Sequence, residues 1–378
     1  MITEILPSTL AVLGAAGFDD TLALGDRIGP VRRVAVVLVD GLGWHLLARA
    51  AEHSPFLADV LAGRIGQVCE LASTLPSTTP TSLVSLGTGA QPGQHGIVGF
   101  TVNVPGTDRV LKHITWRDDP DPARWQPVPT VYERATGVPS AVVLPAAFQH
   151  SGLTVSAYRG ARYVPLTRGD DLADTVLATL TARPGLVYSY TARVDTAAHV
   201  HGIASPQWAD AVATTGVLLA RLVAQLPDDA ALLVTADHGG LDVPAAGRVD
   251  LDTDPRLSAG IRVVAGEPRL RYLHTIDGAT PDVLAAWTDV LGRRASVLDR
   301  DEAIASGMFG EVCDSHRARI GDIVVVCVDD TVVLATGHES PDVAKLIGFH
   351  GSATAAETAI PLITIAGDYP LARNRVTT

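Results

Sequence analysis

Hydrophobic residues in this chain are concentrated in short continuous runs rather than alternating with polar residues. The clearest runs are rich in Val, Leu, Ile and Ala and cover residues 33–39, 140–144, 186–191, 230–235 and 359–366. Runs of this length are typical of strands that are buried on both faces of a parallel sheet. Between several of them lie segments of helical periodicity, notably residues 171–181 and 207–225. This order predicts an α/β fold with a mostly parallel central sheet.

Other segments are less regular. Residues 67–71 and 154–158 are predicted as further strands, and residues 44–51 as a crossover helix. Residues 100–126 mix Asp, Pro and Trp without a clear period. We interpret them as a surface excursion near the mouth of a site.

The chain changes character after residue 242, where short strands and loops rich in Asp and Arg replace the long apolar runs. A buried strand returns only near the C-terminus. We therefore predict that residues 1–242 and 349–378 form the α/β core, and that residues 243–348 form an inserted α+β cap subdomain. A chain of 378 residues is long enough to bury a large core of this kind.

Composition and charge narrow the possible partners. With 47% hydrophobic and 19% charged residues, the chain has the composition of a globular protein and not of a disordered one. Its formal net charge of −12 argues against a nucleic-acid polymer as partner. We expect a small anionic substrate whose charge is offset locally by cationic groups or metal ions.

The cysteines and the N-terminus bear on the compartment. Cys69, Cys313 and Cys327 are odd in number and show no CxxC spacing, which excludes an obvious disulfide framework or thiolate zinc site. The N-terminus lacks the pattern of a signal peptide, and no run approaches the length of a membrane span. We expect a soluble cytoplasmic protein that does not bind membranes, with an oligomeric state that the sequence does not indicate.

Acidic residues and histidines follow the predicted strands. Asp40 ends the first long run, Asp237 and His238 end the run at 230–235, and Asp195 and His199 follow the run at 186–191. The C-terminal ends of strands are where open α/β sheets place ligand-handling groups. Asp195 and His199 are four residues apart, so one face of a helical turn would carry both.

Each of these residues also has a simpler interpretation. The alternative for Asp40 is that it only caps the helix that follows, and an Asp and a His four residues apart can be a surface pair. His201 would point elsewhere on the same helix and is the weaker candidate. His95, in the Gly- and Pro-rich loop at 91–97, is interpreted as a structural histidine.

A candidate nucleophile lies in the segment from Leu75 to Gly89. Thr79 is suited to cap a short helix whose first residue is Pro80, and Gly89 is suited to end it. A helix N-terminus has free N–H groups that attract anions, so a hydroxyl there would meet a phosphate or sulfate ester. The alternative is that Thr79 acts only as a cap.

Taken together, the candidates form a ligand inventory for two divalent ions, and they are Asp40, Thr79, Asp195, His199, Asp237, His238 and His350. Mixed Asp/His sets are typical of catalytic zinc, although manganese also accepts such ligands. Two neighbouring ions can stabilise both the attacking and the leaving oxygen of a displacement. Metal coordination would also lower the pKa of the Thr79 hydroxyl.

These motifs resemble the alkaline phosphatase superfamily, and within it the type I phosphodiesterase/nucleotide pyrophosphatase family. The resemblance covers residues 33–100, 185–242 and 348–366 in the family's order. It rests on Val39-Asp40-Gly41, Thr79-Pro80, Gly89-Ala90-Gln91-Pro92, His95-Gly96-Ile97, Asp195 with His199, Asp237-His238-Gly239 and His350-Gly351-Ser352.

The resemblance implies a three-layer α/β/α sandwich and two metal ions. It implies that one ion is held by Asp195, His199 and His350, and the other by Asp40, Asp237 and His238 with Thr79 beside it. In this family the threonine attacks phosphorus, and water then hydrolyses the phospho-threonine ester. The spacing to Gly89 and the following Pro80 favour Thr79 over its neighbours Ser77 and Thr78.

Two departures affect the expected function. Where the family usually carries an Asn that binds a phosphoryl oxygen, this chain has Phe100, with Asn103 nearby. Sulfatases of the superfamily need a modifiable Cys at the nucleophile, which Thr79-Pro80-Thr81 excludes.

We therefore expect a metal-dependent hydrolase of phosphodiester or pyrophosphate bonds in a small phosphorylated metabolite such as a nucleotide. The alternative on the same scaffold is a phosphomonoesterase or phosphonate hydrolase. A cationic group facing the site from residues 100–126 or 241–348 would favour that alternative. A third hypothesis is a binding protein on an inactive scaffold, although such relics normally lose ligands.

Overall fold

The structure is a computed structural model that describes residues 1–367. Within these residues the largest sheet has seven strands in the order β2-β17-β8-β1-β7-β5-β6. The strands are β1 (Arg33–Val39), β2 (Gln67–Ala72), β5 (Ser140–Pro145), β6 (Arg162–Leu166), β7 (Gly185–Thr191), β8 (Ala230–Thr235) and β17 (Ala359–Ala366). The pairs from β8 through β1, β7 and β5 to β6 are parallel, and β17 is antiparallel to both of its neighbours. The predicted α/β fold with a mostly parallel sheet is confirmed.

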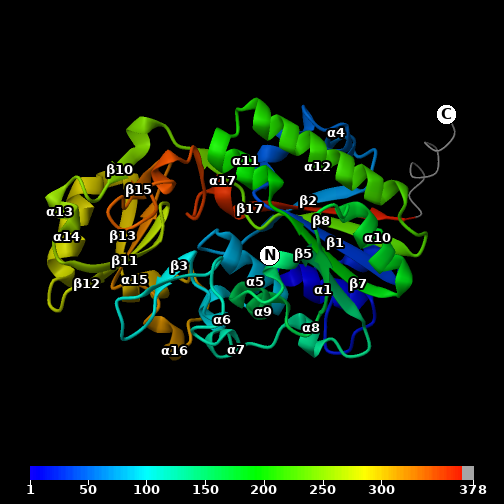
Figure 1. The fold of residues 1–378 in the computed structure, drawn as a ribbon, viewed down its shortest axis with the longest axis horizontal. Helices are drawn as coiled ribbons and strands as arrows, with labels where there is room; N and C mark the ends of the chain where they lie inside the picture. The colour runs from blue at the N-terminus through cyan, green and yellow to red at the C-terminus, as the bar shows by residue number, and fades with distance from the viewer. Residues whose placement is uncertain (368–378) are drawn as a thin grey trace.

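Helices cover both faces of this sheet, so the core has three layers (Figure 1). One face carries α4 (Pro55–Leu61), α10 (Leu172–Ala182), α11 (Arg193–His201) and α12 (Pro206–Ala224). The other carries α1 (Ile5–Val12), α5 (Thr79–Thr88), α8 (Val131–Arg134) and α9 (Gly152–Tyr158). Short helices α2 (Leu24–Ile28) and α3 (Leu47–Ala51) lie in the connections.

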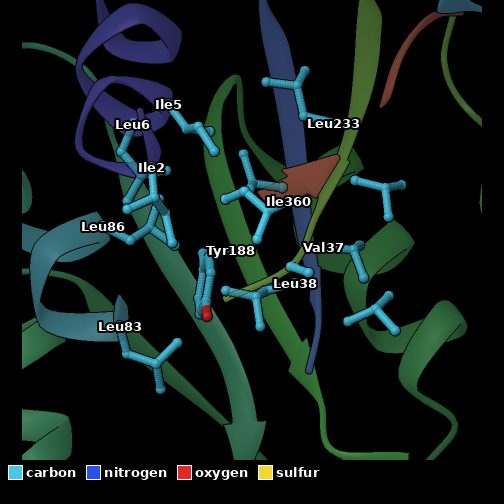
Figure 2. Packing of buried hydrophobic residues seen from close by; sticks show 14 of the residues in the cluster. Ile2, Ile5, Leu6, Val37, Leu38, Leu83, Leu86, Tyr188, Leu233 and Ile360 are labelled. Atoms are coloured by element: carbon cyan, nitrogen blue, oxygen red, sulfur yellow. The ribbon is translucent and has the colours of Figure 1, made fainter. Parts of the chain in front are cut away.

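The N-terminal segment and α5 pack on the sheet in one apolar layer. Figure 2 shows Ile5 and Leu6 beside Leu86, with Tyr188 of β7 facing them. The side chains of Leu83 and Leu86 are buried, as their helical spacing predicts. Burial of this face fixes α5 on the sheet and thereby places its first residue, Thr79, near the strand ends.

A second sheet lies to the left of the seven-stranded sheet in Figure 1. It is antiparallel and has the order β11-β12-β14-β13, formed by β11 (Ile261–Glu267), β12 (Leu270–Thr275), β14 (Ile323–Cys327) and β13 (Ala295–Asp299). Helix α14 (Thr280–Leu291) packs on it through the buried Trp287. The predicted boundaries of the inserted subdomain, at residues 243 and 348, stay a prediction, and residues 368–378 of the predicted core lie outside the described residues.

Short elements join the two sheets. They are the hairpin β3 (Thr101–Asn103) and β4 (Val110–Lys112), and the pairs β10 (Arg248–Asp250) with β15 (Val332–Leu334) and β9 (Leu241–Asp242) with β16 (Gly348–Phe349). The remaining short helices are α6 (Pro92–His95), α7 (Pro122–Trp125), α13 (Pro255–Ser258), α15 (Arg300–Ala305), α16 (Asp314–Arg317) and α17 (Ala355–Thr358). Among residues 1–367, no helix combines the length and apolarity that crossing a bilayer requires.

Two expectations about local structure were wrong. Residues 154–158 form part of helix α9 and not a strand, because the Ser151 hydroxyl caps the helix by accepting a hydrogen bond from the Thr154 amide at 3.1 Å. The strand of this unit is β6, which follows the helix. The excursion at residues 100–126 is also less superficial than expected, since Trp116 and Trp125 are buried and Arg319 stacks on the Trp125 ring.

Candidate active site

Thr79 is the first residue of α5, and Thr78 is the N-cap. The helix therefore begins one residue earlier than expected, with Pro80 in its second position, while Gly89 ends it in the left-handed conformation at φ 70°. The Thr79 hydroxyl lies 3.2 Å from Nε2 of His238. Thr79 thus combines a helix N-terminus with a direct contact to the predicted metal-ligand set.

The C-terminal ends of three adjacent strands, β1, β7 and β8, bring the acidic residues together. Asp40 follows β1 and Asp237 follows β8, while Asp195 lies in the first turn of α11, just after β7. Gly41 allows the close approach, because a Cβ there would lie 2.8 Å from Cβ of Asp195. The backbone of Gly41 has φ 73°, a conformation that residues other than glycine rarely adopt.

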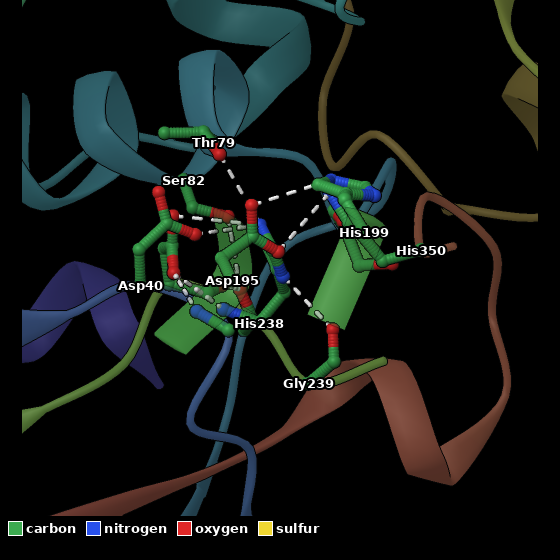
Figure 3. A network of polar contacts seen from close by, with 12 residues as sticks. Asp40, Thr79, Ser82, Asp195, His199, His238, Gly239 and His350 are labelled. Atoms are coloured by element: carbon green, nitrogen blue, oxygen red, sulfur yellow. Dashed lines mark hydrogen bonds and ion pairs between the residues drawn. The ribbon is translucent and has the colours of Figure 1, made fainter. Parts of the chain in front are cut away.

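The seven predicted residues form two groups that meet around Asp195 (Figure 3). In the first, His199 Nε2 lies 3.2 Å from Asp195 Oδ2, and His350 Nε2 lies 3.9 Å from Asp195 Oδ1. In the second, His238 Nε2 lies 3.4 Å from Asp40 Oδ1 and 3.5 Å from Asp237 Oδ2. The structure therefore brings all seven predicted residues into one centre.

The three histidines of the centre are oriented in the same way. The Nδ1 atoms of His199, His238 and His350 lie 2.7, 2.8 and 2.9 Å from the backbone carbonyl oxygens of Gly348, Gly239 and Ser77. A carbonyl can only accept, so each Nδ1 is the protonated nitrogen and each Nε2 carries a lone pair in the neutral ring. Metal-binding histidines are commonly held by such a contact from the other ring nitrogen.

Several groups in the centre lack a partner within the described residues. Oδ1 of Asp40 and Oδ2 of Asp237 are buried without a hydrogen-bond donor. The Nε2 atoms of His199 and His350 lie 3.2 Å apart, close enough for one ion to bind both. Cations between these groups would satisfy all four atoms, so the donor set fits divalent ions with oxygen and nitrogen ligands.

The pKa values of the centre also indicate an excess of negative charge. Burial raises the pKa of Asp40 well above its ordinary value, and the carboxylates of Asp237 and Asp195 raise it further. Burial disfavours the charged form of His199, but the adjacent Asp195 outweighs burial and raises the pKa of His199 to about 9. The site thus concentrates buried negative charge that needs positive compensation.

Other candidates lie outside the centre. His95 is fully buried, and its Nε2 is 2.8 Å from the Ser85 hydroxyl, which fits the structural role expected for it. His201 is exposed at the end of α11. Phe100 lines the cavity next to the centre, whereas Asn103 is buried and is not among the described residues that line it.

Three further residues at the site were missed by the sequence reasoning. The hydroxyl of Tyr190, the penultimate residue of β7, donates to Oδ2 of Asp40. Lys112 and Glu267 line the same cavity, and Glu267 Oε2 accepts a hydrogen bond from the Phe100 amide at 2.9 Å. A signal existed for Tyr190, because its predicted strand leads directly into Asp195, but not for Glu267, whose position depends on the second sheet.

The centre opens into a cavity of about 800 Å³. Thr79, Asp40, Asp195, His199 and His350 lie in its wall, together with residues of the β3–β4 hairpin, α9 and the second sheet. Lys112 is the only Lys or Arg among the described residues that line it, and its ammonium lies 5.2 Å from the centre of the Phe100 ring. The cavity is therefore large enough for a metabolite and has one cationic side chain in its wall.

Comparison with known proteins relates this fold to a family of hydrolases. The sequence profile of the type I phosphodiesterase/nucleotide pyrophosphatase family matches residues 34–353. No curated protein matches the chain in sequence.

Solved structures share the fold at low sequence identity. Murine ectonucleotide pyrophosphatase/phosphodiesterase 5 is similar, with a TM-score of 0.71, 18% identity and coverage of 88% of each chain. An inactive threonine-to-alanine variant of that protein in complex with AMP has the same TM-score and identity, covering 89% of this chain and 88% of that one. Phosphonoacetate hydrolase from Sinorhizobium meliloti 1021, in complex with phosphonoacetate, has a TM-score of 0.65 and 22% identity, covering 89% of this chain and 92% of that one.

The family profile spans most of the chain, and the fold of residues 1–367 agrees with it. Enzymes of this family are metal-dependent, and this chain carries candidate metal-binding residues at the C-terminal ends of its central strands. The chain belongs to the type I phosphodiesterase/nucleotide pyrophosphatase family of the alkaline phosphatase superfamily, a family of phosphoric ester hydrolases.

Proposed function

We propose that this protein hydrolyses phosphodiester or pyrophosphate bonds in a small phosphorylated metabolite such as a nucleotide, with Thr79 as the nucleophile. The observation that carries the proposal is the contact between the Thr79 hydroxyl and the convergent Asp/His set, 3.2 Å from His238 Nε2. The AMP complex of the murine relative, obtained with an inactive threonine-to-alanine variant, supports both the substrate class and the nucleophile.

We assign two metal ions to this centre. Asp195, His199 and His350 would hold one ion, and Asp40, Asp237 and His238 would hold the other next to Thr79. Zinc fits these ligands best, and manganese is the alternative. When bound, the ions would supply Lewis-acid charge that lowers the pKa of the Thr79 hydroxyl and offsets the charge of the phosphoryl group.

The residues of the chain then act in two displacements. Thr79 Oγ1 forms a bond to phosphorus, its proton is lost, and the bond from phosphorus to the leaving oxygen breaks. Water next attacks phosphorus, the bond to Thr79 Oγ1 breaks, and the threonine regains its proton. The free N–H groups at the start of α5 are positioned beside this oxygen and favour negative charge there.

Substitution of the nucleophile tests the proposal. Thr79→Ala should abolish turnover of bis-p-nitrophenyl phosphate while elemental analysis still finds the metal ions, because six other ligands remain. Thr79→Ser keeps a hydroxyl and should retain measurable turnover. Activity of the alanine variant equal to that of the wild type would disprove the nucleophile assignment.

A second candidate function is hydrolysis of a phosphomonoester or a phosphonate. Lys112 in the cavity wall is the observation that favours it, since a dianionic group needs a local cation, and the similar phosphonoacetate hydrolase adds support. The ratio of rates for bis-p-nitrophenyl phosphate and p-nitrophenyl phosphate separates the two functions. A ratio well above one supports the diesterase, and a ratio well below one supports the monoesterase.

We place the protein in the cytoplasm. Cys69, Cys313 and Cys327 are all free thiols within the described residues, which is compatible with a reducing compartment.

A further inference from the structure

Large apolar side chains that are exposed gather at the cavity. Among residues 1–367, nine large hydrophobic side chains are exposed, and four of these, Val110, Ile114, Phe148 and Val200, line the cavity next to Thr79. Their exposed fractions are 40%, 43%, 44% and 51%. Exposed apolar side chains that are grouped around one hollow mark a binding surface, whereas scattered ones need no explanation.

The apolar lining continues from the mouth into the cavity. The four exposed side chains come from the β3–β4 hairpin and the residues after it, from the 3-10 helix Ala146–Phe148 and from α11. Behind them, Leu144 at the end of β5 and Leu153 of α9 also line the wall. Three segments that are distant in sequence thus contribute to one apolar surface that reaches the catalytic centre.

Three hydroxyl groups of this wall are engaged with other protein groups. Thr101 donates to the carbonyl of Gly266 at 2.8 Å, Ser151 donates to Thr154 at 3.0 Å, and Tyr158 donates to Tyr188 at 3.1 Å. No Asn or Gln occurs among the described residues that line the cavity. Neutral amides pair with nucleobase edges through two hydrogen bonds, and the described part of this wall offers none of them.

We infer that the group esterified to the phosphate is apolar, an alkyl or aryl group, and is not a nucleoside. This apolar group of the substrate packs against Val110, Ile114, Phe148 and Val200, while the phosphorus atom lies next to the Thr79 hydroxyl. This inference rests on the proposed function and narrows its substrate class to phosphoric diesters of apolar alcohols. A cavity of about 800 Å³ has room for such a chain beyond the phosphoryl group.

A homologous series of substrates tests the inference. The p-nitrophenyl alkyl phosphates from methyl to hexyl release p-nitrophenolate and leave the alkyl phosphoryl group on Thr79, from which water releases the alkyl phosphate. We expect kcat/KM of the zinc-loaded enzyme to rise up to about fourfold with each added methylene, the factor that corresponds to transfer of one CH₂ out of water. The kcat/KM for the hexyl ester should also exceed that for thymidine 5′-p-nitrophenyl phosphate.

Variants locate the effect in the cavity. Ile114→Ser and Phe148→Ser should lower the ratio of kcat/KM for the hexyl ester to that for the methyl ester. Val217→Ser is the matched control, because Val217 is 63% exposed on α12 and does not line the cavity. It should leave that ratio unchanged.

Two outcomes separate this inference from the proposed function. Turnover that does not depend on chain length, or a preference for the thymidine ester, overturns the apolar substrate and leaves the proposed function standing. If no ester of the series is turned over, the proposed function fails, and binding of the same esters to Thr79→Ala, measured by calorimetry, decides the inference. Affinity that rises with chain length then supports an apolar site, and affinity that does not rise overturns it.

Discussion

At the scale of single residues, the site is determined by what holds each side chain. Each of the three histidines donates Nδ1–H to a backbone carbonyl, so all three Nε2 lone pairs are directed to the centre. Tyr190 holds the second oxygen of Asp40 in a similar way. These contacts reduce the conformations that the ligands must give up when a metal ion binds.

Lys112 provides a prediction about charge selectivity. Lys112→Met should lower kcat/KM for p-nitrophenyl phosphate about fivefold to tenfold, and lower that for a monoanionic diester less, because the lost attraction grows with substrate charge. The effect should shrink at high salt. The measurement is steady-state kinetics at two ionic strengths.

The other lysine of the sequence is a matched control for this substitution. Lys345 forms an exposed ion pair with Asp342 at 2.8 Å and does not line the cavity. Lys345→Met should leave both rates unchanged. Equal losses for monoester and diester in Lys112→Met would argue that Lys112 does not sense substrate charge.

Glu267 provides a prediction about pH and stability. Burial raises the pKa of its carboxyl to about 8, although the Phe100 amide donates to it. Between about pH 4.5 and 8 the unfolded chain loses this proton while the folded protein keeps it, so stability falls as pH rises, by up to about 1.4 kcal/mol per pH unit. Glu267→Gln has no proton to lose and should be more stable than the wild type at pH 8 but similar to it at pH 5.

Urea unfolding of the metal-free proteins at pH 5, 6.5 and 8 measures this difference. If the free energies of unfolding of Glu267→Gln and the wild type differ by the same amount at all three pH values, Glu267 is ionised in the folded protein throughout this range.

At the scale of elements, a buried ion pair ties the second sheet to the catalytic loops. Arg269, in the turn before β12, contacts both carboxylate oxygens of Glu357 in α17, at 3.0 and 2.6 Å, and both side chains are fully buried. The same carboxylate accepts from the Ser352 amide at 2.8 Å, and the Glu357 carbonyl accepts from the Gly239 amide at 2.8 Å. Helix α17 thus supports, through Glu357, the segments that carry His350 and His238.

Breaking this pair should affect both stability and the metal site. Glu357→Gln leaves the guanidinium of Arg269 buried without its counter-charge, which should lower the free energy of unfolding by about 3–5 kcal/mol. It should also weaken zinc binding, because Ser352 and Gly239 lie in the same loops as the candidate ligands His350 and His238. Chemical unfolding and zinc titration of the refolded variant provide the two measurements.

The exposed pair of Arg317 and Asp301 is the control for that experiment. Asp301→Asn should change the free energy of unfolding by less than about 1 kcal/mol and leave zinc affinity unaltered. If Glu357→Gln destabilises the protein but binds zinc as the wild type does, the pair is structural and does not position the ligands.

At the scale of the whole molecule, the carboxylates around the centre oppose folding until cations are bound. Asp40, Asp195 and Asp237 come from three segments and meet in one cluster, in which Asp40 and Asp237 are buried and Asp195 is partly buried. Like charges at this distance repel strongly in a medium of low polarity. Metal ions that bind only the folded protein therefore contribute directly to its stability.

Removal of metal should reveal this repulsion. EDTA should lower the unfolding temperature of the wild type, and zinc at about a thousand times its Kd should restore about 4 kcal/mol of stability. Asp40→Asn should unfold at a higher temperature than the wild type in EDTA, because one buried charge is gone, and should gain less from zinc. Differential scanning calorimetry measures both effects, and an identical response of the two proteins to zinc would contradict the role of Asp40 in metal binding.

Local patterns were sufficient for most of the core and all seven candidate site residues. The apolar runs determine their strands because no other arrangement buries them on both faces, and an Asp or His just after such a strand lies at the sheet edge by chain connectivity alone. The pattern failed at residues 154–158, where β-branched and aromatic residues favour a strand but the cap at Ser151 and packing on the sheet produce α9. It also failed at Trp116 and Trp125, since burial of a loop depends on what covers it.

Periodicity along the chain was enough to predict the fold class, and the motifs carried the resemblance to the family and the set of candidate ligands. Long-range packing sets how these candidates are grouped around Asp195, which carbonyl orients each histidine, and which side chains line the cavity. Lys112, Glu267 and Phe148 reach that cavity from separate segments, and Arg269 supports it from the second sheet. Contacts between segments so far apart in the chain leave no local pattern, so the features that select a substrate appear only after the chain has folded.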